Sequence, residues 1–308
     1  MGDRHRVGVV GARGHTGAEL VRLIRDHLRL DLLFAGSREL DGQPVPGQDD
    51  ILFESIGPDD LATREIEAVF LAMPDGAGDS HVEAVGKDTV IVDISADHRF
   101  DDSWQYGLPE LFREKLRGAT RIANPGCYAT ATQIALAPLV DVISGVPAVF
   151  GVSGYSGAGS TPGPRNDPDR LSDNLMPYKL VGHNHEREAT RHLGMPVRFM
   201  PHVHPAFRGL LITAHVPLGR TMSRDEVRAR FETSYGDEPL IEIRDEIPEL
   251  RDGAGHQGMI LGGFETSADG LSAVVVAAED NLLKGAAVQA VQNLNLALGL
   301  PEFEGLIG

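Results

Sequence analysis

The sequence has few residues of several chemically useful kinds, and each shortage excludes a class of protein. Cys127 is the only cysteine among the 308 residues, which excludes an intramolecular disulfide and a cysteine-rich metal site. No apolar run approaches the length that spans a membrane, and no secretory signal precedes the first β-branched run. We therefore expect a soluble, cytoplasmic protein with no membrane partner.

Acidic residues outnumber basic ones, which gives a formal net charge of −17. Lysine occurs only at Lys87, Lys115, Lys179 and Lys284. Sequence-independent nucleic-acid binding needs a basic surface, so we expect no nucleic-acid partner. The length is enough for one large domain or two of medium size, each with an ample core.

The first half of the chain has the pattern of a dinucleotide-binding fold. Residues 5–10 predict a buried strand, and an amphipathic helix is predicted over residues 16–27. Between them Gly11, Gly14 and Gly17 leave room for a pyrophosphate at the helix N-terminus. Their spacing is G-x-x-G-x-x-G rather than G-x-G-x-x-G, so a plain tight turn is the alternative.

The end of the second predicted strand, residues 30–35, indicates which dinucleotide binds. A carboxylate usually ends this strand in NAD enzymes, whereas Ser37 and Arg38 suit a 2′-phosphate and favour NADP. Glu39 keeps NAD open, and a solvated loop arginine is the other interpretation of Arg38.

Further elements complete an α/β Rossmann domain followed by an α+β domain with a mixed or antiparallel sheet. Strands are predicted at 68–72, 89–94, 146–152, 197–202, 210–217, 240–243, 259–265 and 273–278. Helices are predicted at 128–139, at 223–235 with a capping box, and at 280–298, the last packing back on the first domain. Residues 41–60 are predicted to form a loop with at most a short edge strand. The predicted domains are residues 1–126 with 280–308, which bind NADP, and 127–279, which carry catalysis and dimerisation.

Cys127 is the best candidate nucleophile. It follows a Pro-Gly turn and begins a predicted helix, where unpaired N–H groups and the helix dipole stabilise a thiolate. The alternative is a buried cysteine that serves as a small hydrophobic residue.

A second candidate group consists of His183, His185 and Glu188. If a helix begins here, His185 and Glu188 share a face, and a carboxylate beside an imidazole fixes its tautomer. Spacing does not place this group near Cys127, and hydrogen-bonded helix-start residues are the alternative. His202 and His204 alternate as metal ligands do, but no third ligand has suitable spacing, so we predict no metal site.

Three arginines in Gly-, Pro- or His-rich loops are candidates for binding a phosphate or carboxylate. They are Arg99, Arg165 and Arg208. The alternative for each is a solvated loop residue.

Six segments, in this order along the whole chain, resemble the N-acetyl-γ-glutamyl-phosphate reductases, a family of semialdehyde dehydrogenases. They are GARGHTG at 11–17, VDISADHR at 92–99, NPGCYAT at 124–130, GVSGYSGAG at 151–159, HNHERE at 183–188 and DNLLKGA at 280–286. The resemblance implies NADPH-dependent reduction of N-acetyl-L-glutamyl 5-phosphate to the 5-semialdehyde through a cysteine thioester.

The resemblance also implies roles for individual residues. Cys127 would be the nucleophile and His183 the acid/base, with His185, Glu188 and Tyr178 beside it. The NADP site would comprise Gly11, Arg13, Gly14, His15, Thr16, Gly17, Ser37, Arg38, Ser156, Gly157 and Asn281. The substrate site would comprise Arg99, Asn124, Ser153 and Arg208.

Two positions depart from the family pattern, and two other functions stay open. Asp75 stands where asparagine is expected, and Gly182 where aspartate is expected. The same chemistry on a carrier-bound aminoadipyl phosphate or on aspartyl phosphate is one alternative. A non-catalytic NADP-sensing regulator is the other, because a fold alone does not establish activity. We expect a homodimer or homotetramer.

Overall fold

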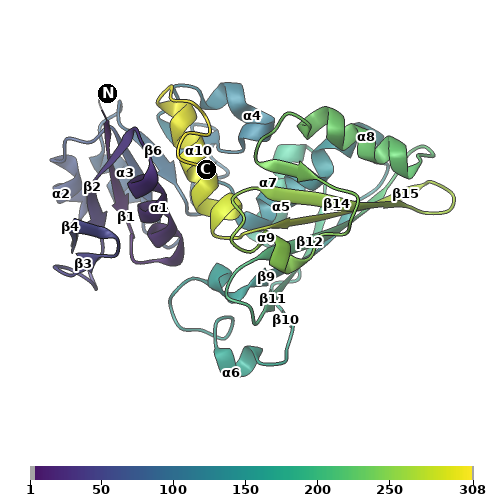
Figure 1. Ribbon diagram of the computed structural model, residues 1–308, viewed down its shortest axis with the longest axis horizontal. Helices are drawn as coiled ribbons and strands as arrows, with labels where there is room; N and C mark the ends of the chain where they lie inside the picture. Colours follow the sequence, from purple (N-terminus) through teal and green to yellow (C-terminus); the bar gives the residue numbers. More distant parts are fainter. Residues whose placement is uncertain (1–3, 307–308) are drawn as a thin grey trace. The chain divides into compact units, whose positions relative to one another are not determined.

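The protein is described by a computed structural model over residues 4–306, which form two compact units. One unit contains the chain up to Pro125 together with the chain from Ala286 onward, and the other runs from Gly126 to Gly285 (Figure 1). Each unit is built on a β-sheet of its own.

The first unit contains a mostly parallel sheet, as the glycine turn and the alternating elements predicted. Within residues 4–306 its strand order is β3-β4-β2-β1-β5-β6-β8-β7. The strands are β1 (His5–Val10), β2 (Leu30–Gly36), β3 (Pro44–Val45), β4 (Gln48–Glu54), β5 (Ala68–Leu71), β6 (Val90–Asp93), β7 (Gln105–Tyr106) and β8 (Arg121–Ala123). The helices are α1 (His15–Asp26), α2 (Pro58–Ala62), α3 (Asp79–Ala84), α4 (Pro109–Leu116) and α10 (Val288–Ala297). The strand order reverses at β1, and ligands of such sheets bind where strands end at this point.

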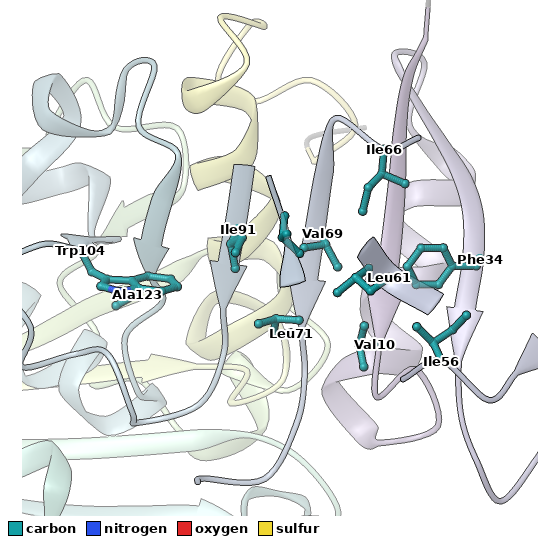
Figure 2. Close-up of a cluster of buried hydrophobic side chains, with 11 residues drawn as sticks. Val10, Phe34, Ile56, Leu61, Ile66, Val69, Leu71, Ile91, Trp104 and Ala123 are labelled. Atoms are coloured by element: carbon teal, nitrogen blue, oxygen red, sulfur yellow. The ribbon is translucent and has the colours of Figure 1, made fainter. Parts of the chain in front are cut away.

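A cluster of apolar side chains fills the core of the first unit (Figure 2). Phe34 is fully buried, and its ring occupies the space beside Gly8, where an added Cβ would lie 2.1 Å from the ring. Figure 2 shows the ring next to Leu61. Burying one such side chain contributes about 1.5–3 kcal/mol. Because Gly8 has no side chain, the Phe34 ring of β2 can pack against the backbone of β1.

Residues 41–60 correct a prediction, because they form β3, β4 and α2 rather than a loop. The glycines account only for turns, where Gly42 takes a φ of +75° and Gly47 a φ of +74°. Phe53 in β4 is buried, and it pairs in parallel with Ala35 of β2, so β4 extends the sheet. The Gly- and Asp-rich composition concealed a strand whose apolar residues gain burial from a neighbour distant in sequence.

The terminal helix packs within the first unit, as predicted. The His27 Nε2 and Asn295 Oδ1 atoms lie 3.1 Å apart, and Asn293 Nδ2 donates to Asn124 Oδ1 at 3.0 Å. The helix starts later than predicted, with a π-helical turn, Leu283–Ala287, that runs into α10. The reason is Asp280, whose Oδ1 accepts the N–H of Leu282 at 2.8 Å and so ends the preceding strand with a turn.

The second unit has a mixed sheet, which confirms the α+β prediction. Within the described chain its order is β10-β11-β9-β12-β15-β14-β13. The strands are β9 (Ala148–Gly154), β10 (Met176–Pro177), β11 (Arg198–His204), β12 (Leu210–Pro217), β13 (Ile241–Ile243), β14 (Met259–Thr266) and β15 (Ser272–Glu279). The helices are α5 (Cys127–Leu136), α6 (Pro168–Leu171), α7 (Asn184–Leu193), α8 (Arg224–Tyr235) and α9 (Leu250–Gly253), with 3₁₀ turns at Ala137–Val142 and Tyr155–Ala158. The predicted capping box of α8 is present, because Ser223 Oγ accepts the Glu226 N–H and Glu226 Oε2 accepts the Ser223 N–H.

Candidate active site

Cys127 is the first residue of α5, and it is the only residue of that helix that is not buried. The preceding Gly126 has extended backbone angles, and among residues 4–306 no side chain caps the helix and no acidic residue lies in its first turn. Residues 128–136 are all buried, so α5 is a core helix whose N-terminal end carries a half-buried thiol. The positive end of the helix dipole favours the thiolate, which is the reactive form.

The His-x-His-x-x-Glu group lies at this same helix end, which the sequence spacing did not reveal. Glu188 in α7 is fully buried, and its Oε2 accepts the backbone N–H of Gly126 at 3.0 Å. Its other oxygen lies 3.9 Å from His185 Nε2. The predicted shared helical face of His185 and Glu188 is therefore confirmed, and the carboxylate fixes α7 to the residue that precedes Cys127.

His183 is held as a neutral imidazole with a defined tautomer. It is the N-cap of α7, and its Nδ1 accepts the backbone N–H of His185 at 3.1 Å. The proton of the neutral ring therefore resides on Nε2. Burial, followed by the nearby His185 and Lys179, lowers the pKa of His183 to about 3. The ring can donate a hydrogen bond from Nε2 without carrying charge.

Two tyrosines enclose the imidazole. The Tyr178 ring meets the His183 ring edge-on, with centroids 5.5 Å apart, and the Tyr128 ring does so at 6.5 Å. Burial, and then the neighbouring Cys127, raises the pKa of the Tyr178 hydroxyl, so it stays protonated. Tyr128 donates its hydroxyl proton to the carbonyl of His202 at 2.7 Å, which fixes the start of α5 against β11.

Asn281 joins the polar residues at the end of β9. Its Nδ2 donates to Ser156 Oγ at 2.9 Å, and its Oδ1 accepts the Gly209 N–H at 3.0 Å. Ser153 lies nearby, because a Cβ on Gly157 would meet its Oγ at 3.3 Å. The sequence-predicted residues Ser153, Ser156, Gly157 and Asn281 therefore form one cluster.

Three of the residues expected at the substrate site are bonded to the protein itself. Arg208 Nε lies 2.6 Å from Oδ2 of the fully buried Asp280. Arg99 is buried, and it donates to the carbonyl oxygen of Asn124 at 2.8 Å. The Asn124 side chain is fully buried, where its Nδ2 donates to the Ala286 carbonyl oxygen and its Oδ1 accepts from Asn293. The contacts of Arg99 and Asn293 hold Asn124, and a direct role of these residues in substrate binding stays a prediction.

The glycine turn in the first unit has the shape of a phosphate cradle. Gly11 has a φ of +84°, and a Cβ there would lie 2.2 Å from the Ala72 carbonyl oxygen. A Cβ on Gly17 would lie 2.3 Å from the Gly11 carbonyl oxygen. The first turn of α1 contains His15, Thr16 and Gly17, and it has no side-chain cap within residues 4–306. Tight packing without side chains and an uncapped helix end together fit a dinucleotide pyrophosphate.

The end of β2 lies against this turn, because Gly11 N and Ala12 N both donate to the Gly36 carbonyl. Arg13 Nη2 lies 3.0 Å from Glu39 Oε1. Arg38 is exposed, and Ser37 Oγ accepts the Leu40 N–H at 3.3 Å. Arg13 and Arg38 thus stand beside the strand end where the adenosine ribose binds in this fold.

The two departures from the family pattern each have a local partner or reason. Asp75 Oδ1 accepts the Ala96 N–H at 2.9 Å, and Asp97 in turn accepts the Gly76 N–H. An acceptor oxygen at position 75 therefore joins two loops, and asparagine offers the same atom. Gly182 has a φ of +68°, a left-handed conformation that glycine adopts without strain.

Sequence reasoning missed Gly285 and Lys179. A Cβ on Gly285 would lie 2.7 Å from the Cys127 Cβ, so this glycine bounds the nucleophile directly. Lys179 Nζ donates to Asn184 Oδ1 at 3.3 Å beside His183. The Gly285 contact had no signal in the sequence, because the two residues meet only through the tertiary fold, whereas Lys179 and Asn184 are five residues apart.

His202 and His204, which alternate in sequence as metal ligands do, each contact the backbone. His202 Nδ1 lies 3.1 Å from the Met200 carbonyl oxygen, and His204 Nδ1 accepts the Ala206 N–H at 3.0 Å. Over the part of the chain that is described, no three His, Cys, Asp or Glu side chains are placed to hold a metal ion. Likewise, no helix in residues 4–306 is both long and apolar enough to cross a membrane.

Two family models match the chain. The semialdehyde dehydrogenase NAD binding domain matches residues 6–119, and the semialdehyde dehydrogenase dimerisation domain matches residues 127–281. The chain therefore belongs to the semialdehyde dehydrogenase family. Within it, the chain is 51% identical over 308 residues to N-acetyl-gamma-glutamyl-phosphate reductase of Stenotrophomonas maltophilia (strain R551-3), with 97% of each chain covered. It is 47% identical over 308 residues to the protein of the same name from Xylella fastidiosa (strain M23), covering 97% of this chain and 94% of the relative.

Solved structures show the same fold. Aspartate semialdehyde dehydrogenase II of Vibrio cholerae, complexed with ASA, superposes with a TM-score of 0.80 at 18% identity, covering 97% of this chain and 99% of that one. Aspartate semialdehyde dehydrogenase of Candida albicans, solved with NADP, gives a TM-score of 0.74 at 15% identity, covering 99% and 100%. At such identities the likeness establishes the fold alone.

Proposed function

We propose that the chain is an NADPH-dependent reductase of N-acetyl-L-glutamyl 5-phosphate, which it converts to N-acetyl-L-glutamate 5-semialdehyde and phosphate in arginine biosynthesis. The relatives at about half identity carry this activity in their name. The single observation that supports the chemistry best is the hydrogen bond from Gly126 N–H to Glu188, which joins the thiol-bearing helix end to the imidazole group.

Cys127 is the nucleophile in this proposal. Its sulfur bonds to the carbonyl carbon of the acyl phosphate, and the carbon–oxygen bond to phosphate breaks with its electron pair on the leaving oxygen. The negative oxygen of the tetrahedral intermediate faces the N–H groups of the first turn of α5. Covalent capture leaves a thioester, and NADPH, when bound, supplies the hydride that reduces it.

His183 acts through its Nε2–H. Because Nδ1 is occupied by the His185 N–H, Nε2 is the ring atom that carries a donor proton. Nε2–H donates a hydrogen bond to the oxyanion that forms each time the carbonyl becomes tetrahedral, and the proton stays on the ring when the tetrahedral species collapses and the thiolate leaves. The neutral state keeps this donor present at physiological pH. Glu188 and Tyr178 position the imidazole, and His185 is the second candidate for proton transfer.

NADP is the cofactor in this proposal, and the glycine turn with Arg13, Ser37 and Arg38 holds its phosphates. Two arginine side chains at the end of β2 supply positive charge for a 2′-phosphate. We assign cofactor binding to the unit that carries α1, and catalysis to the unit that carries α5. Ser156, Gly157 and Asn281 are assigned to the nicotinamide, and Ser153, Asn124, Arg99 and Arg208 to the substrate side. The cytoplasmic location stays a prediction.

A homodimer is proposed through the outer face of the second sheet. Phe150 in β9 is 38% exposed, and its register neighbours are Met200 and Thr213. The next rung pairs Val152 with Leu211 of β12 and His202 of β11. Met200, Phe150, Val152 and Leu211 therefore form an apolar band that Thr213 and His202 flank. The matching family model is named a dimerisation domain, which favours a second copy as the occupant of this band. Phe150→Glu should shift the mass measured by light scattering toward the monomer, and an unchanged mass would exclude this face.

The activity is tested in reverse, by following NADPH formation from N-acetylglutamate semialdehyde with and without inorganic phosphate. Aspartate semialdehyde, which lacks the acetamide, is the comparison substrate. Strong phosphate dependence with the acetylated substrate alone is the expected result. Equal rates without phosphate would mean that water resolves the thioester, and the protein would be a hydrolytic aldehyde dehydrogenase. Turnover with neither substrate would refute the proposal and direct attention to aminoadipyl phosphates or a regulator.

A further inference from the structure

Two exposed cations border the group that encloses His183. The Arg165 guanidinium carbon lies 4.9 Å from the centroid of the Tyr178 ring, and that ring lies 5.5 Å from His183. Lys179 follows Tyr178 in the chain, and its Nζ donates to the side chain of Asn184, the residue after His183. The Tyr178 ring therefore separates Arg165 from the imidazole, and Lys179 contacts the residue that follows His183.

Arg165 differs from the other two loop arginines that the sequence singled out. Arg208 is engaged with the buried Asp280, and Arg99 is buried on the Asn124 carbonyl. Arg165 is exposed, and its guanidinium lies over the Tyr178 ring. A guanidinium fixed in this way by an aromatic face is ready to bind a carboxylate bidentately.

The backbone at Lys179 supports a functional role. Its φ is +39°, a left-handed conformation that costs a residue with a side chain free energy. Asp173, with a φ of 53°, is the other non-glycine residue with positive φ in residues 4–306. With this backbone the exposed Lys179 donates from Nζ to Asn184 Oδ1 at the start of α7.

We infer that Arg165 and Lys179 hold the α-carboxylate of the substrate, and that this contact determines the specificity for an amino-acid-derived aldehyde or acyl phosphate. The inference rests on the proposed function and names the residues that recognise its substrate. The phosphate of the substrate is attached to the reacting carbonyl, whereas the carboxylate is four carbon–carbon bonds away, about 5 Å in an extended chain. Arg165, separated from the imidazole by the whole Tyr178 ring, suits the distant anion rather than the leaving group.

The test uses the reverse reaction with two aldehydes that differ only in this carboxylate, N-acetylglutamate semialdehyde and 4-acetamidobutanal. The quantity compared is the ratio of their kcat/KM values in the wild type and in Arg165→Gln and Lys179→Gln. Loss of a charge-assisted contact should reduce the ratio by about 10- to 100-fold for Arg165→Gln, and by less for Lys179→Gln. Arg170→Gln removes an equal charge from an exposed position in the neighbouring helix α6 and should leave the ratio unchanged.

Further measurements separate the possible failures. An unchanged ratio in a folded Arg165→Gln protein, with the melting temperature of the wild type, overturns the inference while leaving the proposed function intact. A raised KM for inorganic phosphate with an unchanged ratio also overturns it, because the cations would then bind the leaving group. Absence of phosphate-dependent turnover in the wild type overturns the proposed function and the inference together. Partial recovery of the ratio in Arg165→Lys would support recognition by charge.

Discussion

Gly285→Ala should displace the nucleophile without changing any catalytic group. The added Cβ would lie 2.7 Å from the Cys127 Cβ and 3.0 Å from Glu279 Oε1. Carbon atoms in contact are about 3.5–4.0 Å apart, so the two must separate by about 1 Å. Because position 285 lies in a helical turn, alanine gains about 1 kcal/mol in helix propensity, against about 1–3 kcal/mol for overpacking. Overpacking outweighs propensity, and the strain is released at Cys127.

A displacement of 1 Å at a reacting atom costs about 100-fold in rate, and we expect a loss in kcat of this order. The assay is the phosphate-dependent reverse reaction, together with the rate of thiol alkylation and the melting temperature. Gly78→Ala is the matched control, since Gly78 has a φ of −88° and open space around its Cβ. Wild-type kcat and alkylation rate in Gly285→Ala would refute the packing argument.

Four further predictions concern the nucleophile, the imidazole, the pH dependence of stability and the buried ion pair. Cys127→Ser should lose several orders of magnitude in kcat while keeping its Kd for NADP, and near-normal turnover would exclude covalent catalysis. His183→Asn keeps an acceptor for the N-cap of α7 but removes Nε2–H, so kcat should fall by about 10²–10⁴-fold. A larger loss in His185→Asn would mean that His185, and not His183, is the residue that acts on the oxyanion. Because the folded pKa of His183 is about 3 and its ordinary value is 6.5, the unfolded chain binds the extra proton between these values. The contribution of neutral His183 to the free energy of unfolding is present above pH 6.5 and is lost as the pH falls toward 3. The free energy of unfolding in urea should therefore decline less between pH 7 and pH 4.5 in His183→Asn than in the wild type. An equal decline contradicts a buried, neutral His183. Asp280→Asn leaves Arg208 beside an uncharged partner and should cost about 3–5 kcal/mol, measured by urea unfolding, whereas Glu65→Gln in an exposed pair should cost less than about 1 kcal/mol.

Most regular elements could be predicted from the sequence, because their signals are local. The strand His5–Val10 and the strand Leu210–Pro217 have the predicted bounds, and the capping box of α8 lies where Ser223 predicted it. These signals depend on residues within one element. Residues 41–60 could not be predicted in the same way, because Phe53 joins the sheet only through its pairing with Ala35.

In the candidate site, too, local signals are visible in the sequence and long-range contacts are not. The Pro-Gly-Cys turn and the His-x-His-x-x-Glu spacing are visible in the sequence, and each defines one half of a chemical arrangement. Their meeting depends on the tertiary contact between Glu188 and Gly126, across 62 residues of chain. The tautomer of His183 is likewise set by a cap hydrogen bond that no residue pattern specifies.

The sequence by itself determined the kinds of groups available, a single thiol at a helix start, a glycine turn after the first strand, and two imidazoles with a carboxylate. These features follow from residue type and local periodicity, which the chain carries before it folds. Only the tertiary structure decided which loop arginine forms an ion pair with a buried carboxylate and which lies over an aromatic ring. Arg208 is held by Asp280 while Arg165 rests on Tyr178, because burial and ion pairing depend on neighbours that are remote in sequence.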